Sequence, residues 1–289
     1  MRYVRCDKPQ PRCDKSFDAT RELHRFMITP YLVAQQAAWR AGRILLHHFQ
    51  SHPAQVSARS TYDITTQADV EAEHAIIECI GRNFPDHQIL GEETTGRPVE
   101  ADRLWVVDPL DGTNNFIHGL LQFSVSIAYY EHGQPRLGVV YQPATGDWYV
   151  ARRGEGAFHN GRPLRVGDQT RLDQVLVGVG FYYDRGPKMR ATLAAIADLF
   201  GRHIQGIRRF GSAALDLCMV ASGQLGAFFE LDLSPWDYAA GRLIVEEAGG
   251  TVSTCLGEPL QLERTSVLAG NPALHPALLE VIRPHAASV

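Results

Sequence analysis

The stretch Leu104–Phe116 reads LWVVDPLDGTNNF. Four apolar residues run directly into Asp108, and a second aspartate, Asp111, follows three positions later beside a glycine and a threonine. One interpretation is a buried strand that stops at Asp108-Pro109 and continues as a solvated Asp-Gly turn. The other is a metal site at the carboxyl end of a central strand, with a phosphate-binding loop beside it. The remainder of the sequence distinguishes the two.

The composition describes an ordinary globular protein. The chain has 289 residues, of which 45% are hydrophobic and 21% charged, so it can bury a sizeable core. Its formal net charge of -4 argues against nucleic acid as the main partner, because phosphate backbones require clustered Lys and Arg. An acidic protein also repels a phosphate ester, so a phosphate substrate would require bound divalent cations. No apolar run approaches the roughly 20 residues that span a bilayer, and we expect no membrane segment.

The cysteines and the amino terminus indicate a cytoplasmic location. The five cysteines are scattered and form no CxxC pair, which disfavours a zinc knuckle and a disulfide framework. Residues 1–27 are charged, contain two prolines and lack the apolar stretch of a signal peptide. We predict that they form a flexible extension, with Met27 as a candidate natural start.

Hydrophobic periodicity predicts helices and strands in the first half. Thr29-Pro30 is typical of a helix start, and apolar residues then recur at helical spacing from Val33. A second helix is predicted over 69–84, and the run 103–107 is typical of a strand buried on both faces. Alternation from Phe123, with turns at intervals, predicts an antiparallel meander that reaches about Val166.

The second half alternates between strand and helix patterns. No repeat or long linker interrupts it, so we predict one α/β domain over 28–289, with sub-domains of about 28–166 and 167–289. The predicted strands are 175–181, 205–210, 227–231, 250–255 and 266–270, and the predicted helices are 189–200, 212–223, 235–250 and 275–282.

Acidic residues stand at the ends of apolar elements in four places. Carboxylates without neighbouring His or Cys are the hard oxygen ligands that suit Mg²⁺ or Mn²⁺. Two such ions about 4 Å apart can clamp the attacking and leaving oxygens of a phosphoryl displacement. The acids are Asp69, Glu92 with Glu93, Asp108 with Asp111, and Asp237.

Each acid also has an ordinary structural explanation. Asp69 could be a first-turn acid that interacts with a helix dipole, and Glu92 a surface charge. Asp237 follows Ser234 by three positions, so SPWD satisfies a capping box. Other phosphate chemistries fit less well: the P-loop motif GxxxxGK[ST] is absent, and Asp108 and Asp111 are not spaced like an aspartyl-phosphate pair. The small residues of DGTNN could offer backbone amides to phosphate.

Several segments in a fixed order resemble the inositol monophosphatase family, from about Ile28 onward. WVVDPLDGTNNF resembles that family's first signature, and WDYAAGRLIVEEAGG resembles its second. GEE and GSAALDL fall at the expected places before each of them. The resemblance implies a sandwich of alternating αβαβα layers and a homodimer that hydrolyses a small phosphate ester.

The resemblance also implies roles for individual residues. Glu92 and Thr113 would position the nucleophilic water, with Asp69 bonded to Thr113 behind it, while Glu93 would only support the site. The implied metal ligands are Glu92, Asp108, the Leu110 carbonyl, Asp111 and Asp237. The implied substrate contacts are Asp111, Gly112, Thr113 and Asp237, with Gly211, Ser212, Ala213 and Glu230 on the polyol side.

Two positions depart from the family pattern. Thr94 stands where many members have serine, and Arg59 is the only basic residue of a loop in which relatives often carry lysine. The resemblance therefore implies two Mg²⁺ ions firmly and a third less so, with Mn²⁺ as a substitute and lithium as an inhibitor.

The expected substrate is inositol 1-monophosphate. Fructose 1,6-bisphosphate, phosphoadenosine phosphate and histidinol phosphate remain open within the same family. A non-enzymatic regulatory interaction protein that keeps the fold is a further alternative, which predicts at least one broken ligand position, and none is broken here.

Overall fold

The computed structural model describes residues 29–51, 56–58, 64–93, 101–181 and 185–289. The predicted extension 1–27, Arg59 and Thr94 lie outside these ranges.

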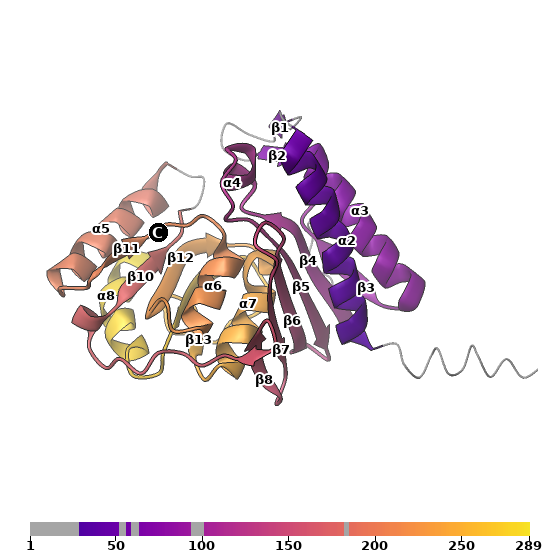
Figure 1. The fold of residues 1–289 in the computed structure, drawn as a ribbon. Coiled ribbons are helices and arrows are strands. Elements are labelled where there is room, and N and C mark those ends of the chain that lie inside the picture. Colours follow the sequence, from indigo (N-terminus) through magenta and orange to yellow (C-terminus); the bar gives the residue numbers. More distant parts are fainter. Residues whose placement is uncertain (1–28, 52–55, 59–63, 94–100, 182–184) are drawn as a thin grey trace, which may run out of the picture.

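The chain forms alternating layers of helix and sheet (Figure 1). Helices α2 (Pro30–Ser51) and α3 (Gln67–Asn83) cover one face of a seven-stranded sheet of order β3-β4-β5-β6-β7-β8-β9. Helices α6 (Ala213–Ala221) and α7 (Pro235–Glu247) lie between this sheet and a five-stranded sheet of order β11-β10-β12-β14-β13. Helices α5 (Pro187–Gly201) and α8 (His275–Ala286) cover the outer face of the second sheet. The predicted αβαβα sandwich is confirmed.

The remaining elements have the following bounds. The first sheet consists of β3 (Gln88–Gly91), β4 (Arg103–Asp111), β5 (Ser124–Glu131), β6 (Gln134–Gln142), β7 (Asp147–Arg152), β8 (Gly156–His159) and β9 (Arg162–Pro163). The second consists of β10 (Leu176–Val179), β11 (Gly206–Arg208), β12 (Ala227–Leu233), β13 (Thr251–Ser253) and β14 (Thr265–Gly270). A small pair, β1 (Val56–Ala58) and β2 (Ile64–Thr66), the short helix α4 (Thr113–Ile117) and a 3-10 turn at Leu172–Gln174 complete the description.

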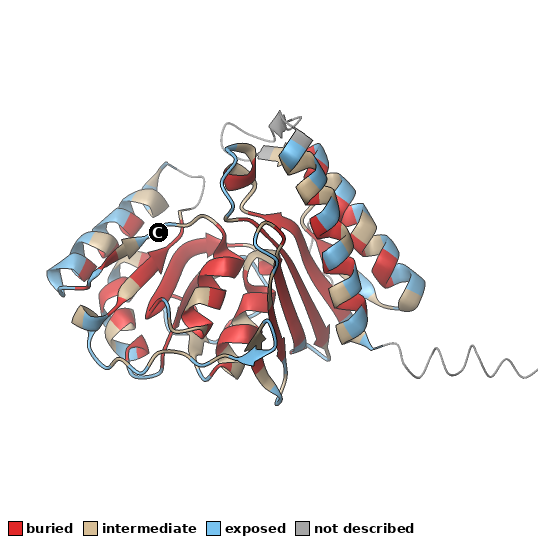
Figure 2. Cartoon of the chain, viewed as in Figure 1, coloured by how far each residue is buried: buried red, intermediate tan, exposed pale blue. Residues whose placement is uncertain are grey.

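The apolar run of β4 is buried on both faces, as predicted. Leu104 and Val106 belong to the core shared with α6 and α7, whereas Trp105 and Val107 belong to the core under α2 and α3. This two-residue alternation is the pleat of a strand. Figure 2 shows the result, with buried strands between helices whose outer faces are exposed.

The end of β4 differs from the simpler sequence interpretation. The strand does not stop at Asp108-Pro109 but continues to Asp111, with a register shift against β5 between the two aspartates. Pro109 has no N–H to donate, so an irregular segment of the ladder suits it. Asp108 and Asp111 are only 1% and 8% exposed, and the interpretation as a solvated turn is wrong.

Most other predicted boundaries agree with the structure to within a few residues. Thr29 accepts a hydrogen bond from the amide of Leu32 and caps α2. The predicted antiparallel meander is confirmed from β5 onward, but it ends at Pro163 and not at Val166. The division into two sub-domains stays a prediction. Of the helices in the described ranges, none combines the length and the apolar character needed to cross a bilayer.

The contact between β6 and α7 gives a stability prediction. A Cβ atom on Gly138 would lie 2.6 Å from the carbonyl oxygen of Ala240, so Gly138→Ala forces the helix away from the sheet. We expect the free energy of unfolding to fall by about 1–3 kcal/mol, measured by urea denaturation. Gly81→Ala in α3 is the control, because a Cβ there meets no atom within 4 Å. The control should gain roughly 0.5–1 kcal/mol from helix propensity, and equal effects of the two changes would contradict the packing argument.

Candidate active site

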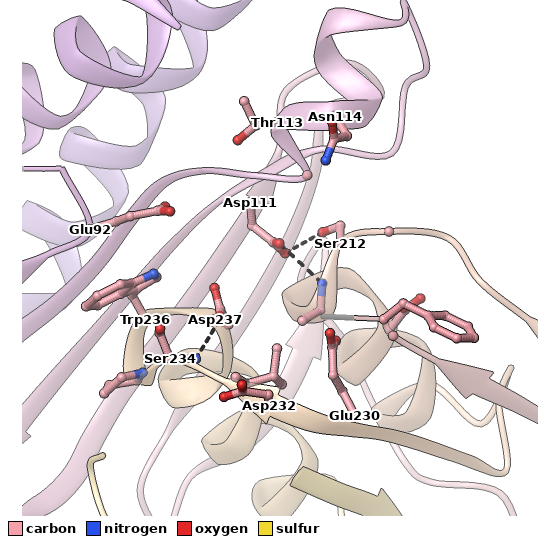
Figure 3. A pocket seen from close by; sticks show the side chains of 18 of the residues that line it. Glu92, Asp111, Thr113, Asn114, Ser212, Glu230, Asp232, Ser234, Trp236 and Asp237 are labelled. Atoms are coloured by element: carbon pink, nitrogen blue, oxygen red, sulfur yellow. Dashed lines mark hydrogen bonds between the residues drawn. The ribbon is translucent and has the colours of Figure 1, made fainter. Parts of the chain in front are cut away.

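A pocket of about 360 Å³ opens where the end of β4 meets the second half of the chain (Figure 3). Its wall combines the start of α4, the segment before α6, the end of β12 and the start of α7. Of the residues predicted for the site, those that line the pocket are Glu92, Asp111, Gly112, Thr113, Gly211, Ser212, Ala213, Glu230 and Asp237. Asp69, Asp108 and Leu110 do not line it and lie behind its wall.

Asp111 joins the two halves of the chain at this pocket. Its Oδ2 accepts two hydrogen bonds, one from the Ser212 hydroxyl and one from the Ala214 amide at 2.8 Å. Its Oδ1 accepts a hydrogen bond from the Ala213 amide at 3.3 Å. Burial raises the pKa of Asp111 to about 6, while the bonds from Ser212 and these amides act in the opposite direction. The amino-terminal end of α6 therefore partly compensates a buried carboxylate.

The Ser212 hydroxyl serves Asp111 and the helix rather than the pocket space. It also accepts a hydrogen bond from the Leu215 amide and so caps α6. Its predicted contact with substrate stays a prediction.

Asp108 lies beneath the pocket and is held by its own turn. Its Oδ1 accepts a hydrogen bond from the Leu110 amide at 3.0 Å. Burial raises its pKa well above the usual range, and the negative charges of Glu92, Asp111 and Asp237 raise it further. These four carboxylates thus act on one another electrostatically, as expected of a cation site.

Asp237 forms the capping contact and also lines the pocket, and its role as a metal ligand stays a prediction. Its Oδ2 accepts a hydrogen bond from the Ser234 amide at 2.7 Å, which is the capping contact of α7. The same side chain faces the pocket, together with Glu92 and Asp111 (Figure 3). Burial, followed by the charge of Asp111, raises the pKa of Asp237 to about 8. Capping alone does not account for its position beside the charge of Asp111.

The hydrogen bond that the resemblance implies between Thr113 and Asp69 is present. The Thr113 hydroxyl lies 3.2 Å from Asp69 Oδ1 and 3.1 Å from the carbonyl oxygen of Leu110. Asp69 also accepts hydrogen bonds from the amide and hydroxyl of Thr66 and so caps α3. Thr113 is therefore fixed between α3 and the end of β4.

Gly112 requires the absence of a side chain. Its φ of +95° lies in the left-handed region, and a Cβ would lie 2.7 Å from the carbonyl oxygen of Gln122. The chain turns there from β4 into α4, which is where the family resemblance implies phosphate amides.

Glu93 lies in a supporting position. Its Oε1 accepts a hydrogen bond from the Thr65 hydroxyl at 2.7 Å, and its amide donates to Glu73 at 3.1 Å. The Glu92 amide donates to Val107 of β4 at 3.3 Å, which places the preceding turn beside the strand end.

Sequence reasoning missed two residues of the site. Asn115 donates to the carbonyl oxygens of Gln122, at 2.6 Å, and Phe210, at 2.7 Å, and so ties α4 to a segment 95 positions away. Asp216, one turn into α6, lines the pocket and is 1% exposed. Asn115 lies in a sequence that is typical of a turn, so nothing there indicated its distant partners. Asp216 is the one charged residue in an apolar helix, and this position could have indicated that its carboxyl is buried.

The carboxylates are the right type of ligand for a divalent cation, but their side chains are not oriented around one point. They are buried oxygen donors that raise one another's pKa, and hard ions such as Mg²⁺ prefer such donors. Within the described residues, however, no three His, Cys, Asp or Glu side chains are gathered into a ready-made metal site. Asp111 and Asp237 are directed at backbone amides, so small side-chain rotations would be needed to converge on an ion.

Comparisons with known proteins agree on one family. The sequence profile of the inositol monophosphatase family matches residues 29–287. A Nus factor SuhB of Pseudomonas aeruginosa is 40% identical over 259 residues, covering 88% of this chain and 95% of that protein. An inositol-1-monophosphatase of Mesorhizobium japonicum is 40% identical over 253 residues, covering 87% and 95%. The crystal structure of extragenic suppressor protein suhB from Bartonella henselae matches with a TM-score of 0.82 and 36% identity, covering 88% of this chain and 98% of that one.

The buried carboxyl of Asp69 predicts a pH-dependent stability. Burial raises its pKa from 3.8 to about 6, so the folded protein holds this proton more tightly than the unfolded chain does. The contribution is fully present below pH 4 and is lost as the pH rises through 6. Relative to wild type, Asp69→Asn should therefore gain up to about 3 kcal/mol of unfolding free energy between pH 4 and pH 7.

The measurement is urea denaturation of chelator-treated protein at both pH values. Asp102→Asn removes an exposed carboxylate and is the matched control. An Asp69→Asn difference that does not change with pH would contradict the role of burial.

Proposed function

Because the chain belongs to the inositol monophosphatase family, we propose that it is a magnesium-dependent phosphomonoesterase. Its proposed substrate is a small polyol phosphate, with inositol 1-monophosphate as the first candidate. The products are the free alcohol and inorganic phosphate.

The observation that carries this proposal is the cluster of buried carboxylates at the pocket. Asp108 and Asp111 are 1% and 8% exposed and Asp237 is partly buried, and the repulsion among the three costs folding free energy. A purely structural role does not require such an arrangement, whereas a site for a divalent cation does.

Glu92, Asp108, the Leu110 carbonyl, Asp111 and Asp237 would hold two or three Mg²⁺ ions, with Mn²⁺ as a substitute. Bound Mg²⁺ would supply an activated water and neutralise the phosphate charge. The residues of the chain would position the water and the phosphate. The Thr113 hydroxyl, oriented by Asp69, and the Glu92 carboxylate position the attacking water. The backbone amides of Gly112 and Thr113 hold the phosphate in line with it.

The alcohol part of the substrate would lie against the wall formed by the second half of the chain. Glu230 accepts hydrogen bonds from substrate hydroxyls, and Gly211, Ser212 and Ala213 shape the wall beside it. Burial raises the pKa of Glu230 well above its usual range, because a buried carboxylate lacks the hydrogen bonds of water. The hydroxyls of a bound ligand would supply such hydrogen bonds. Fructose 1,6-bisphosphate, phosphoadenosine phosphate and histidinol phosphate are the alternative substrates.

A second candidate function is that of an interaction protein. It is favoured by the name Nus factor, carried by a relative as similar to this chain as the inositol-1-monophosphatase is. A homodimer, a cytoplasmic location and inhibition by lithium are further expectations of the proposed enzyme.

Activity should require added magnesium. Without a cation the acidic pocket repels a phosphate dianion, so treatment with a chelator should abolish phosphate release from inositol 1-monophosphate. Activity should return on addition of Mg²⁺ and, in part, of Mn²⁺. Appreciable turnover by the fully metal-stripped protein would contradict the proposal.

Asp237→Asn separates the ligand role from the capping role. Asparagine keeps the shape of the side chain and part of the cap, so the stability cost should be on the order of 1 kcal/mol. Loss of a ligand should instead lower kcat by at least about 100-fold. Circular dichroism and thermal melting test the fold, and phosphate release tests the chemistry. Normal turnover with a lowered Tm would show that Asp237 only caps the helix and is not a ligand.

A further inference from the structure

Two cationic side chains line the otherwise acidic pocket. One of them, Arg264, is paired with Asp232: its Nε and Nη2 lie 2.7 and 3.0 Å from the two carboxylate oxygens, and Lys188 contacts the same carboxylate. The other, Arg209, is exposed. Among the described residues, Arg209 is the lining cation that forms no ion pair.

The position of Arg209 is fixed by its neighbours. Gly211 has a φ of +87°, and a Cβ on it would lie 2.4 Å from Arg209 Nη1, so the guanidinium lies against the glycine backbone. Asn115 donates to the carbonyl oxygen of Phe210 at 2.7 Å and holds this segment beside α4. The guanidinium is thus kept beside Gly211, on the wall proposed for the alcohol part of the substrate.

Two buried acids lie on the same side of the pocket as Arg209. Asp216 has an oxygen, Oδ1, that is buried and has no hydrogen-bond partner within the described part of the chain. Glu230 is 8% exposed. Burial raises the pKa of both carboxyls, and the charge of Arg209 counteracts that rise. This side therefore offers hydrogen-bond acceptors beside a planar cation, which is a combination suited to a ligand with both hydroxyls and a negative charge.

We infer that Arg209 is a specificity-determining residue that binds a second anionic group of the substrate. Among the substrates proposed above, this favours those whose alcohol part carries a further phosphate or carboxylate, such as fructose 1,6-bisphosphate, over inositol 1-monophosphate. This inference rests on the proposed phosphatase function and goes beyond it by naming the charge of the leaving group. An arginine fork binds such groups through two parallel hydrogen bonds, and a neutral polyol would leave it in water without gain.

Two substrates that differ only in the second group provide the test. Fructose 1-phosphate and fructose 1,6-bisphosphate share the sugar, so their ratio of kcat/KM isolates the distal phosphate. The wild-type protein should favour the bisphosphate by roughly tenfold or more, through KM. Arg209→Gln should bring the ratio of kcat/KM for the two substrates close to one, and Arg209→Lys should retain part of the preference.

Arg208→Gln is the matched control. Arg208 is also exposed and adjacent in sequence, but its guanidinium donates to the carbonyl oxygen of Ile207 and does not line the pocket. This variant should keep the wild-type ratio. Equal losses on both substrates in Arg209→Gln, or an unchanged ratio, would overturn the inference, because an arginine that only offsets pocket charge affects every phosphate ester alike.

Calorimetry separates failure of this inference from failure of the proposed function. If the wild-type protein released phosphate neither from inositol 1-monophosphate nor from either sugar at fixed Mg²⁺, the phosphatase proposal would fail. The Kd values of the two sugar phosphates at fixed Mg²⁺ would then decide the role of Arg209. Tighter binding of the bisphosphate that is lost in Arg209→Gln would uphold the inference, and the absence of any preference would overturn it.

Discussion

The burial of several carboxylates at one junction is the constraint on which the rest of this structure depends. An ionised carboxylate removed from water costs several kcal/mol unless hydrogen bonds or opposite charges compensate it. Asp108, Asp111 and Asp237 lie close enough together to raise one another's pKa. The compensation comes from backbone amides where α6 and α7 begin, because unpaired N–H groups and the helix dipole favour negative charge there. Hydrogen bonds to buried carboxylates, in addition to apolar packing, therefore fix the positions of the helices between the two sheets.

The pocket at this junction depends on contacts between residues that are far apart in the sequence. Asp111 ends a strand of the first sheet, yet its partner Ser212 lies 101 positions away and begins a helix that packs against the second sheet. Asn115 and Phe210 are joined across a similar interval. Changes at these contacts should therefore alter the position of the proposed metal ligands relative to the wall proposed for the alcohol part of the substrate. Such changes are expected to affect KM and kcat together, whereas changes in the outer cores would act on stability alone.

Relatives of similar identity carry two different names, inositol-1-monophosphatase and Nus factor SuhB. The architecture offers a physical reason why one fold can suit both. The pocket lies at the junction of the sheets, whereas the outer helices α2, α3 and α5 present exposed faces to the surroundings (Figure 2). A partner bound to an outer helix would leave the pocket open, so selection on one surface need not remove the carboxylates of the other. The intact acids in this chain favour the enzyme.

The sequence alone determined the layers and the candidate ligands. Period-two alternation in 123–129 and the apolar run before Asp108 specified strands, because side-chain periodicity is a local property of the backbone. The acids were recognisable because each follows an apolar element, and the family resemblance assigned their roles. Local chemistry also predicted the caps at Thr29 and Asp237, which involve neighbours three residues apart.

Only the tertiary structure decided what depends on distant partners. No spacing could show that β4 passes through a register shift to reach Asp111, or that the Ser212 hydroxyl is engaged by that carboxylate. The same holds for Asp216, which looked like an ordinary polar position in a helix, and for Arg209, whose place depends on Gly211 and Asn115. The energies of buried charges depend on which groups surround them, and that environment is formed only when the two sheets and the helices between them pack together.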